Sequence, residues 1–142
     1  MSEFKVSGNA ETRPLHPDIT EDKISRLVDA FYERGFADQR LGPIFMKHIG
    51  LDRSAHMHTI KQFWSSVLLK TRSYSGQPVP VHLKLTEVQR DDFAIWLDHW
   101  RATANEIFVP EAAAIVIASA ERIAESLKLA MFGSPELFKP RR

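Results

Sequence analysis

His82 is the residue of this chain whose surroundings most favour chemistry. It follows the loop-forming residues 71–80 and lies in the apolar run Val79-Pro80-Val81-His82-Leu83-Lys84-Leu85. A neutral imidazole that binds a metal needs one free ring nitrogen, a hydrogen bond that orients the other nitrogen, and apolar walls that exclude water. The setting of His82 suits that role. A ring that simply donates to a nearby backbone carbonyl is the alternative, and both interpretations stay open at this point.

His56 and His58 form a second group of imidazoles. On a strand both rings would lie on one face, whereas on a helix they point about 200° apart at ~100° per residue, so they cannot easily share a metal there. Only His56 falls on the apolar stripe of the helix predicted for this region. That stripe continues through Ile60, Phe63 and Val67. A histidine on such a stripe is either a core residue with satisfied hydrogen bonds or a ligand-binding side chain.

Tyr32 and Trp96 add two further hydrogen-bond donors to apolar surroundings. Tyr32 follows the core-facing Phe31, and Trp96 lies in a strongly patterned helix. Buried donors must find partners, so a polar ligand in a common pocket would satisfy Tyr32, His56 and Trp96 together. Separate partners within the core are the alternative. The remaining histidines are assigned to the termini and the surface; they are His16, His48 and His99.

The composition excludes several classes of protein. A chain of 142 residues with 44% hydrophobic content fits one globular domain. Its 19 Lys and Arg are interspersed with 18 Asp and Glu, so we expect a solvated mixed surface and no nucleic-acid partner. The absence of cysteine excludes disulfides, thiolate metal sites and cysteine nucleophiles, so any metal must be held by histidine or carboxylates.

The chain also lacks the patterns of export and membrane insertion. Residues 1–20 have no apolar core of signal-peptide length, and no apolar run approaches the roughly 18 residues of a membrane span. We therefore expect a cytoplasmic protein with no membrane partner.

The hydrophobic periodicity predicts an all-α fold. Thr20 can cap a first helix that ends near Gly35, Thr86-Glu87-Val88-Gln89 matches a capping box, and Pro110 suits the first turn of a last helix that stops at Gly133. The expected helices cover about residues 20–35, 55–70, 86–107 and 110–133.

No long helix is expected in the remaining segments. Gly42-Pro43 interrupts residues 37–50, so only one or two short turns are expected there. We expect a flexible arm over residues 1–19, a single domain over residues 20–133 and a flexible tail over residues 134–142.

Five groups of residues occur in a characteristic order and spacing. They are Phe31-Tyr32, Leu41-Gly42-Pro43-Ile44-Phe45, His56 with Phe63-Trp64, Gly76-Gln77-Pro78 followed by His82-Leu83-Lys84-Leu85, and Ile95-Trp96-Leu97. The ordered set resembles that of the group III truncated haemoglobins, although single pieces of it are common. The resemblance covers about residues 20–132. The long amino-terminal arm and the carboxyl-terminal tail depart from the family pattern and do not affect the pocket motifs.

The resemblance implies a two-over-two α-helical sandwich that binds haem b, with a short loop and turn before the proximal histidine. It makes His82 the proximal iron ligand and places Tyr32, His56 and Trp96 on the distal side. In a variant of this arrangement, His56 itself closes the sixth coordination position of the iron. The other residues expected to contact haem are Phe31, Phe45, Ile60, Phe63, Trp64 and Leu85.

The implied function is binding of the diatomic gases O2, NO and CO. A polar distal pocket slows ligand escape, which favours ligand chemistry or sensing over bulk transport. An NO dioxygenase-like or a peroxidase-like activity would fit, with a reductase that the sequence does not identify. The alternative from another class is a cofactor-free helical interaction or regulatory module, in which the aromatic stripes serve only as core.

Overall fold

The computed structural model describes residues 14–50, 52–69 and 85–133, and these contain five α-helices and no strand. The helices are α1 (Glu21–Ala37), α2 (Leu41–His48), α3 (Ser54–Leu69), α5 (Asp92–Ile107) and α6 (Pro110–Phe132). The predicted all-α class is therefore confirmed over the described residues. His82 and the loop before it lie outside them.

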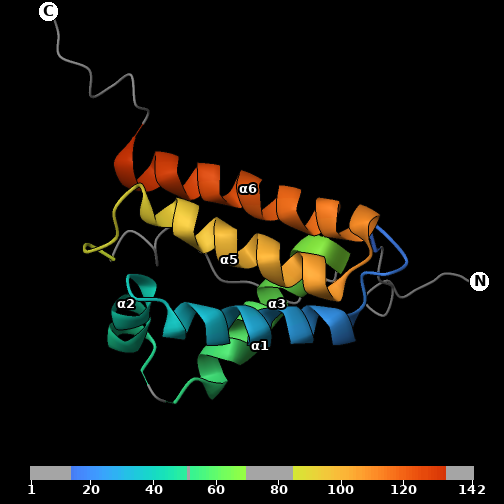
Figure 1. The fold of residues 1–142 in the computed structure, drawn as a ribbon, viewed down its shortest axis with the longest axis horizontal. Helices are drawn as coiled ribbons and strands as arrows, with labels where there is room; N and C mark the ends of the chain where they lie inside the picture. The colour runs from blue at the N-terminus through green and yellow to red at the C-terminus, as the bar shows by residue number, and fades with distance from the viewer. Residues whose placement is uncertain (1–13, 51, 70–84, 134–142) are drawn as a thin grey trace, which may run out of the picture.

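The four long helices form two packed pairs (Figure 1). α5 and α6 lie side by side and run in opposite directions, and α1 packs against α3. α1 also contacts α5, and α3 contacts α6, so the two pairs form a two-layer sandwich. The short α2 lies against the end of α1. No described helix is long and apolar enough to cross a membrane.

The first and last helices begin as the sequence predicts. The Thr20 side chain accepts a hydrogen bond from the Lys23 backbone N–H, which satisfies one of the free donors of the α1 amino terminus. Pro110 is the first residue of α6, where its missing N–H costs no hydrogen bond, and Gly133 ends that helix with φ of 76°. α1 runs to Ala37, slightly beyond the predicted end at Gly35.

Where one or two short turns were expected over residues 37–50, the structure has the eight-residue α2, and Gly42 and Pro43 lie inside its first turn. The first N–H groups of a helix have no partner within it, so proline is tolerated there. Gly42 also allows a close approach of two helices: a Cβ at this position would lie 2.6 Å from the backbone oxygen of Phe36.

The predicted capping box was wrong, since residues 86–91 form turns and α5 begins at Asp92. The Asp92 carboxylate accepts a hydrogen bond from the Gln89 backbone N–H at 2.7 Å. It also accepts one from the Arg40 guanidinium at 2.7 Å. α5 therefore begins at Asp92 rather than near residue 86 because Asp92 pairs with Arg40, which is far away in the sequence.

The buried face of α3 is rotated from the predicted one. Trp64, Ser65, Leu68 and Leu69 are buried, whereas the predicted stripe of His56, Ile60, Phe63 and Val67 is only half-buried. The Trp64 ring stacks on that of Trp100 with centroids 4.4 Å apart. This contact directs the Trp64 side of α3, rather than the predicted stripe, toward the core.

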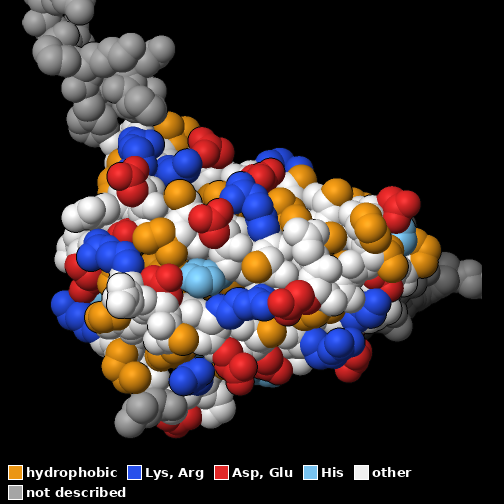
Figure 2. All heavy atoms as spheres, viewed as in Figure 1, with side chains coloured by type: hydrophobic (Ala, Val, Ile, Leu, Met, Phe, Trp, Pro, Cys, Tyr) orange, Lys and Arg blue, Asp and Glu red, His pale blue; other side chains and the backbone are white. Residues whose placement is uncertain are grey.

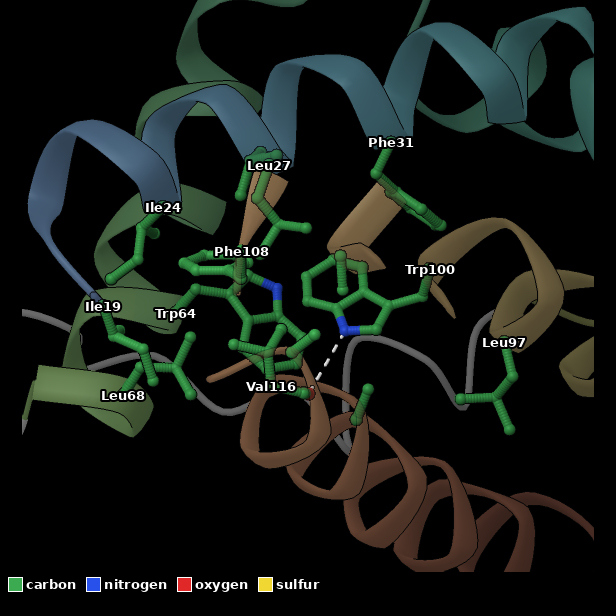
Figure 3. Packing of buried hydrophobic residues seen from close by; sticks show 14 of the residues in the cluster. Ile19, Ile24, Leu27, Phe31, Trp64, Leu68, Leu97, Trp100, Phe108 and Val116 are labelled. Atoms are coloured by element: carbon green, nitrogen blue, oxygen red, sulfur yellow. Dashed lines mark hydrogen bonds between the residues drawn. The ribbon is translucent and has the colours of Figure 1, made fainter. Parts of the chain in front are cut away.

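Trp100 stands at the centre of the core (Figure 3). Only 1% of the residue is exposed, and its indole N–H donates to the Val116 backbone oxygen at 3.3 Å. Burying a tryptophan requires such a partner for its one polar group. By contrast, acidic and basic side chains are interspersed over the face drawn in Figure 2, as the composition predicts.

The packed domain begins before residue 20. Ile19 is 1% exposed and belongs to the core, although the sequence placed it in the flexible arm. The Asp18 carboxylate accepts a hydrogen bond from the Val109 backbone N–H at 2.9 Å and pairs with Lys23. These contacts tie the start of the described chain to the turn between α5 and α6.

Replacing Ile19 tests this boundary. Ile19→Ala should lower the free energy of unfolding by about 2–5 kcal/mol, because it leaves a cavity in a packed site. Leu15→Ala is the control, since Leu15 is 42% exposed and its loss should cost about 0.5 kcal/mol or less. Urea unfolding measures both variants. Equal small effects would show that Ile19 is not packed in solution.

Candidate functional site

A cavity of ≈ 220 Å³ lies between the two layers and the short α2. Five of the predicted site residues line it: Tyr32, Phe45, His56, Leu85 and Trp96. The structure thus brings together side chains from α1, α2, α3 and α5 that lie as much as 64 positions apart in the sequence. Leu41 and Ile44, which also line the cavity, belong to the same sequence motif as Phe45. The sequence did not indicate the other lining residues, which are His48, Ile49, Val88, Asp92, Phe93 and Leu127.

The hydroxyl of Tyr32 and Nε2 of His56 form a hydrogen bond of 3.1 Å at the wall of this cavity. Tyr32 comes from the buried face of α1, and His56 comes from the first turn of α3. Burial raises the pKa of Tyr32 well above its usual value, so the phenol keeps its proton at physiological pH. The neutral hydroxyl is therefore a permanent O–H donor beside the cavity.

Trp96 presents its indole to the same cavity from α5. Its ring is held by a parallel stack on Trp100, with centroids 5.7 Å apart, and by an edge contact to Phe31 at 5.5 Å. Among the described residues the Trp96 N–H has no hydrogen-bond partner. Trp96 is half-buried, so this donor is available to a group in the cavity.

Four predicted site residues stand outside the lining of this cavity. Phe31 and Trp64 are buried in the core, and Phe31 supports the site from behind because its ring contacts both Tyr32 and Trp96 edge-on. Ile60 and Phe63 are half-buried on α3. Their predicted contacts with haem remain predictions.

His82 lies outside the described residues, so its predicted role as a metal ligand stays a prediction. Leu85, three positions later, lines the cavity and is the first described residue after the gap. In the described part of the chain, no three histidine or acidic side chains are grouped so that they could hold a metal ion by themselves.

A cluster of charged and polar side chains, here called the polar rim, joins α2 and its amino-terminal cap to the first residue of α5 and the turn before it. Its members are Arg40, Lys47, His48, Glu87 and Asp92. Arg40 binds both oxygens of Asp92, at 2.7 and 2.9 Å. Glu87 accepts hydrogen bonds from Lys47 at 2.9 Å and contacts His48 at 2.8 Å.

The polar rim reaches the cavity through His48 and Asp92. His48 is exposed, as the sequence predicts, and it also lines the cavity. Arg40 and Asp92 are 52 positions apart, and no spacing rule links them. The opposite charges of Arg40 and Asp92 are the only sequence signal that could have indicated this ion pair.

The comparisons with known proteins identify the family. No family model matches the chain. A curated relative from Campylobacter jejuni, described as "Group 3 truncated hemoglobin ctb", is 33% identical over 109 residues, which are 75% of this chain and 86% of the relative. This chain belongs to the group III truncated haemoglobins.

A solved structure agrees with that assignment. The crystal structure of a group III truncated hemoglobin from Campylobacter jejuni superposes with a TM-score of 0.78 at 31% identity, covering 82% of this chain and 94% of that one. The predicted family and two-over-two fold are confirmed. Family membership makes haem-based gas binding the general activity of this truncated haemoglobin, and the cofactor-free alternative gains no support.

The polar rim should make the free energy of unfolding depend on pH in the acid range. The Lys47 ammonium, with His48, holds the pKa of Glu87 at about 2, below its usual 4.5. Arg40 likewise lowers the pKa of Asp92. A carboxyl group whose pKa is lower in the folded than in the unfolded state stabilises the fold at pH values above its unfolded-state pKa. This stabilisation is lost as the pH falls through its folded-state pKa.

The urea unfolding midpoint should therefore fall between pH 4.5 and 2, and the fall should be smaller in Glu87→Gln. The exposed Glu111 supplies the control variant, Glu111→Gln, which should follow the unmodified protein. Identical pH profiles for all three proteins would show that Glu87 does not contribute to the acid dependence of stability.

Proposed function

We propose that this truncated haemoglobin binds haem b in the cavity and retains O2, NO or CO there through Tyr32, His56 and Trp96. Retention serves ligand chemistry or sensing rather than bulk transport. The observation that carries the proposal is the Tyr32–His56 hydrogen bond of 3.1 Å at the wall of an apolar cavity. Family membership supports the haem-based part of it.

The residues around the cavity fit a flat, mainly apolar group. Phe45, Leu85, Val88 and Phe93 supply aromatic and aliphatic walls, which exclude water and bind an apolar ring system. Haem, when bound, would supply an iron that can take a diatomic ligand. His82 is proposed as the residue that would hold the haem iron, because its motif matches that of the family.

Tyr32 acts by holding a proton where a ligand can use it. If His56 carries its proton on Nε2, that N–H donates to the Tyr32 oxygen and leaves the phenol O–H free to donate into the cavity. If Nε2 is unprotonated, the phenol donates to His56 instead. A ligand with partial negative charge favours the first arrangement, because a phenol O–H directed at that charge stabilises it.

Such donors lengthen the time that a ligand stays bound. A neutral hydrogen bond contributes about 1 kcal/mol and one to a charged acceptor contributes more, while ~1.4 kcal/mol corresponds to a tenfold change in rate. Two bonds, from Tyr32 and Trp96, would slow escape by about one to two orders of magnitude. Slow escape suits an NO dioxygenase-like or a peroxidase-like reaction, which requires an electron-donating reductase as partner.

His56 has a second proposed role in the absence of gas. Its ring stands within hydrogen-bonding distance of Tyr32 at the cavity wall. After a rotation of its ring, His56 would be able to bind the haem iron itself. The same side chain would then compete with the ligand rather than retain it. The hydrogen bond to Tyr32 favours the retaining role, since swinging away would break it.

Removing the Tyr32 hydroxyl tests the proposal. Tyr32→Phe keeps the ring packing but removes the O–H donor, so the O2 dissociation rate of the ferrous protein should rise roughly tenfold. Stopped-flow displacement of O2 measures this rate. CO is the internal control, because it is a weaker hydrogen-bond acceptor and its dissociation should change less. An unchanged O2 rate would exclude Tyr32 from ligand retention.

A further inference from the structure

Gly35 faces the interior of the protein, three positions after Tyr32 on α1. A Cβ built at this position would lie 2.3 Å from the Cε2 atom of the Phe45 ring, far inside the normal contact distance. The ring of Phe45, which comes from α2, therefore occupies the space that any other residue at position 35 would fill with its own side chain.

The backbone does not require a glycine here. Gly35 lies inside a helix, and the positive φ angles recorded for described glycines are at Gly50 and Gly133 only. Glycine in a helix interior is unfavourable relative to alanine, because it loses more conformational freedom on folding. The disadvantage at position 35 is offset by the room that it leaves for Phe45.

Phe45 is enclosed on three sides. It packs on Gly35, makes an edge contact with Phe36 at a centroid distance of 5.4 Å, and lies against the Tyr32 ring, also at 5.4 Å with an interplanar angle of 36°. Its fourth side lines the cavity. The Phe45 ring thus stands between Gly35 and the Tyr32 ring.

We propose that Gly35 is a positioning residue of the distal pocket: the space at its missing side chain seats the Phe45 ring, and that ring holds Tyr32 within hydrogen-bonding distance of His56. This inference rests on the proposed function, because it concerns the donor that retains the gas. Gly35 acts through Phe45 and touches no ligand itself.

A side chain at position 35 must displace the Phe45 ring. Tyr32 and Phe36 block two directions, so the ring moves toward the cavity. Tyr32 then loses the surface that supports its ring, and the direction of its hydroxyl changes relative to His56. The pocket becomes smaller and its polar donor less well aimed.

The test is a series of five variants: Gly35→Ala, Phe45→Leu, the double variant that combines these two, and, as matched controls, Gly42→Ala alone and Gly42→Ala with Phe45→Leu. Leucine removes the ring atoms that an added Cβ would meet, so it should relieve the conflict at position 35. Gly42 lies close to the Phe36 backbone oxygen rather than to Phe45, so Phe45→Leu should not rescue a substitution there.

The urea midpoint, the CO infrared spectrum and the O2 dissociation rate are measured on each variant. Urea unfolding of the haem-free protein reports packing, and the infrared stretching frequency of CO in the ferrous haem protein reports the polarity around the ligand. We expect Gly35→Ala to lower the urea midpoint, opposite to the usual effect of this substitution in a helix. It should also shift the CO frequency and raise the O2 dissociation rate by roughly fivefold to tenfold. The double variant should return to the values of Phe45→Leu alone.

Two results would overturn the inference. One is a Gly35→Ala protein with a raised urea midpoint and an unshifted CO frequency. The other is a loss of stability that Phe45→Leu does not rescue. If the unmodified chain takes up no haem, the proposed function fails by itself, because the urea series still shows whether the Phe45 ring depends on Gly35.

Discussion

The hydrogen bond between Tyr32 and His56 joins α1 to α3 inside an apolar wall, and the rest of the site is arranged around it. A buried phenol and a half-buried imidazole are costly unless each has a partner. Pairing them across the two helices satisfies part of this requirement. It leaves protons beside the cavity that a polar ligand can share, so the same contact serves both the fold and the chemistry.

The surrounding packing keeps this contact in place. Phe31 and Trp100 fill the core behind the pocket and fix Trp96 by ring contacts, while Phe45 supports Tyr32 from the side of α2. Because interiors are closely packed, small changes in these rings move the donors. The polar rim then ties the start of α2 to the start of α5 through the Arg40–Asp92 ion pair.

Local signals in the sequence predicted much of the fold. Thr20, Pro110 and Gly133 act on their own helix ends, so the boundaries that they mark were correct. The predictions that failed depended on distant contacts: the start of α5 follows the pairing of Asp92 with Arg40, and the buried face of α3 follows the stacking of Trp64 on Trp100.

The candidate site shows the same division. Tyr32, His56 and Trp96 were found together because unusual donors stood in apolar patterns and matched the motifs of a family. His48 and Asp92 also line the cavity, but no spacing could indicate them, since ordinary charged residues become part of a wall only through the fold.

The most direct test of the central claim is a haemin titration of the purified protein followed by tryptophan fluorescence and visible absorption. The chain has three tryptophans: Trp96 lines the cavity, Trp100 stacks on it, and Trp64 stacks on Trp100. Haem bound in this cavity should therefore quench the emission with a sharp end point at one haem per chain, accompanied by an intense haem absorption band. A titration without saturable quenching or a defined band would contradict the account.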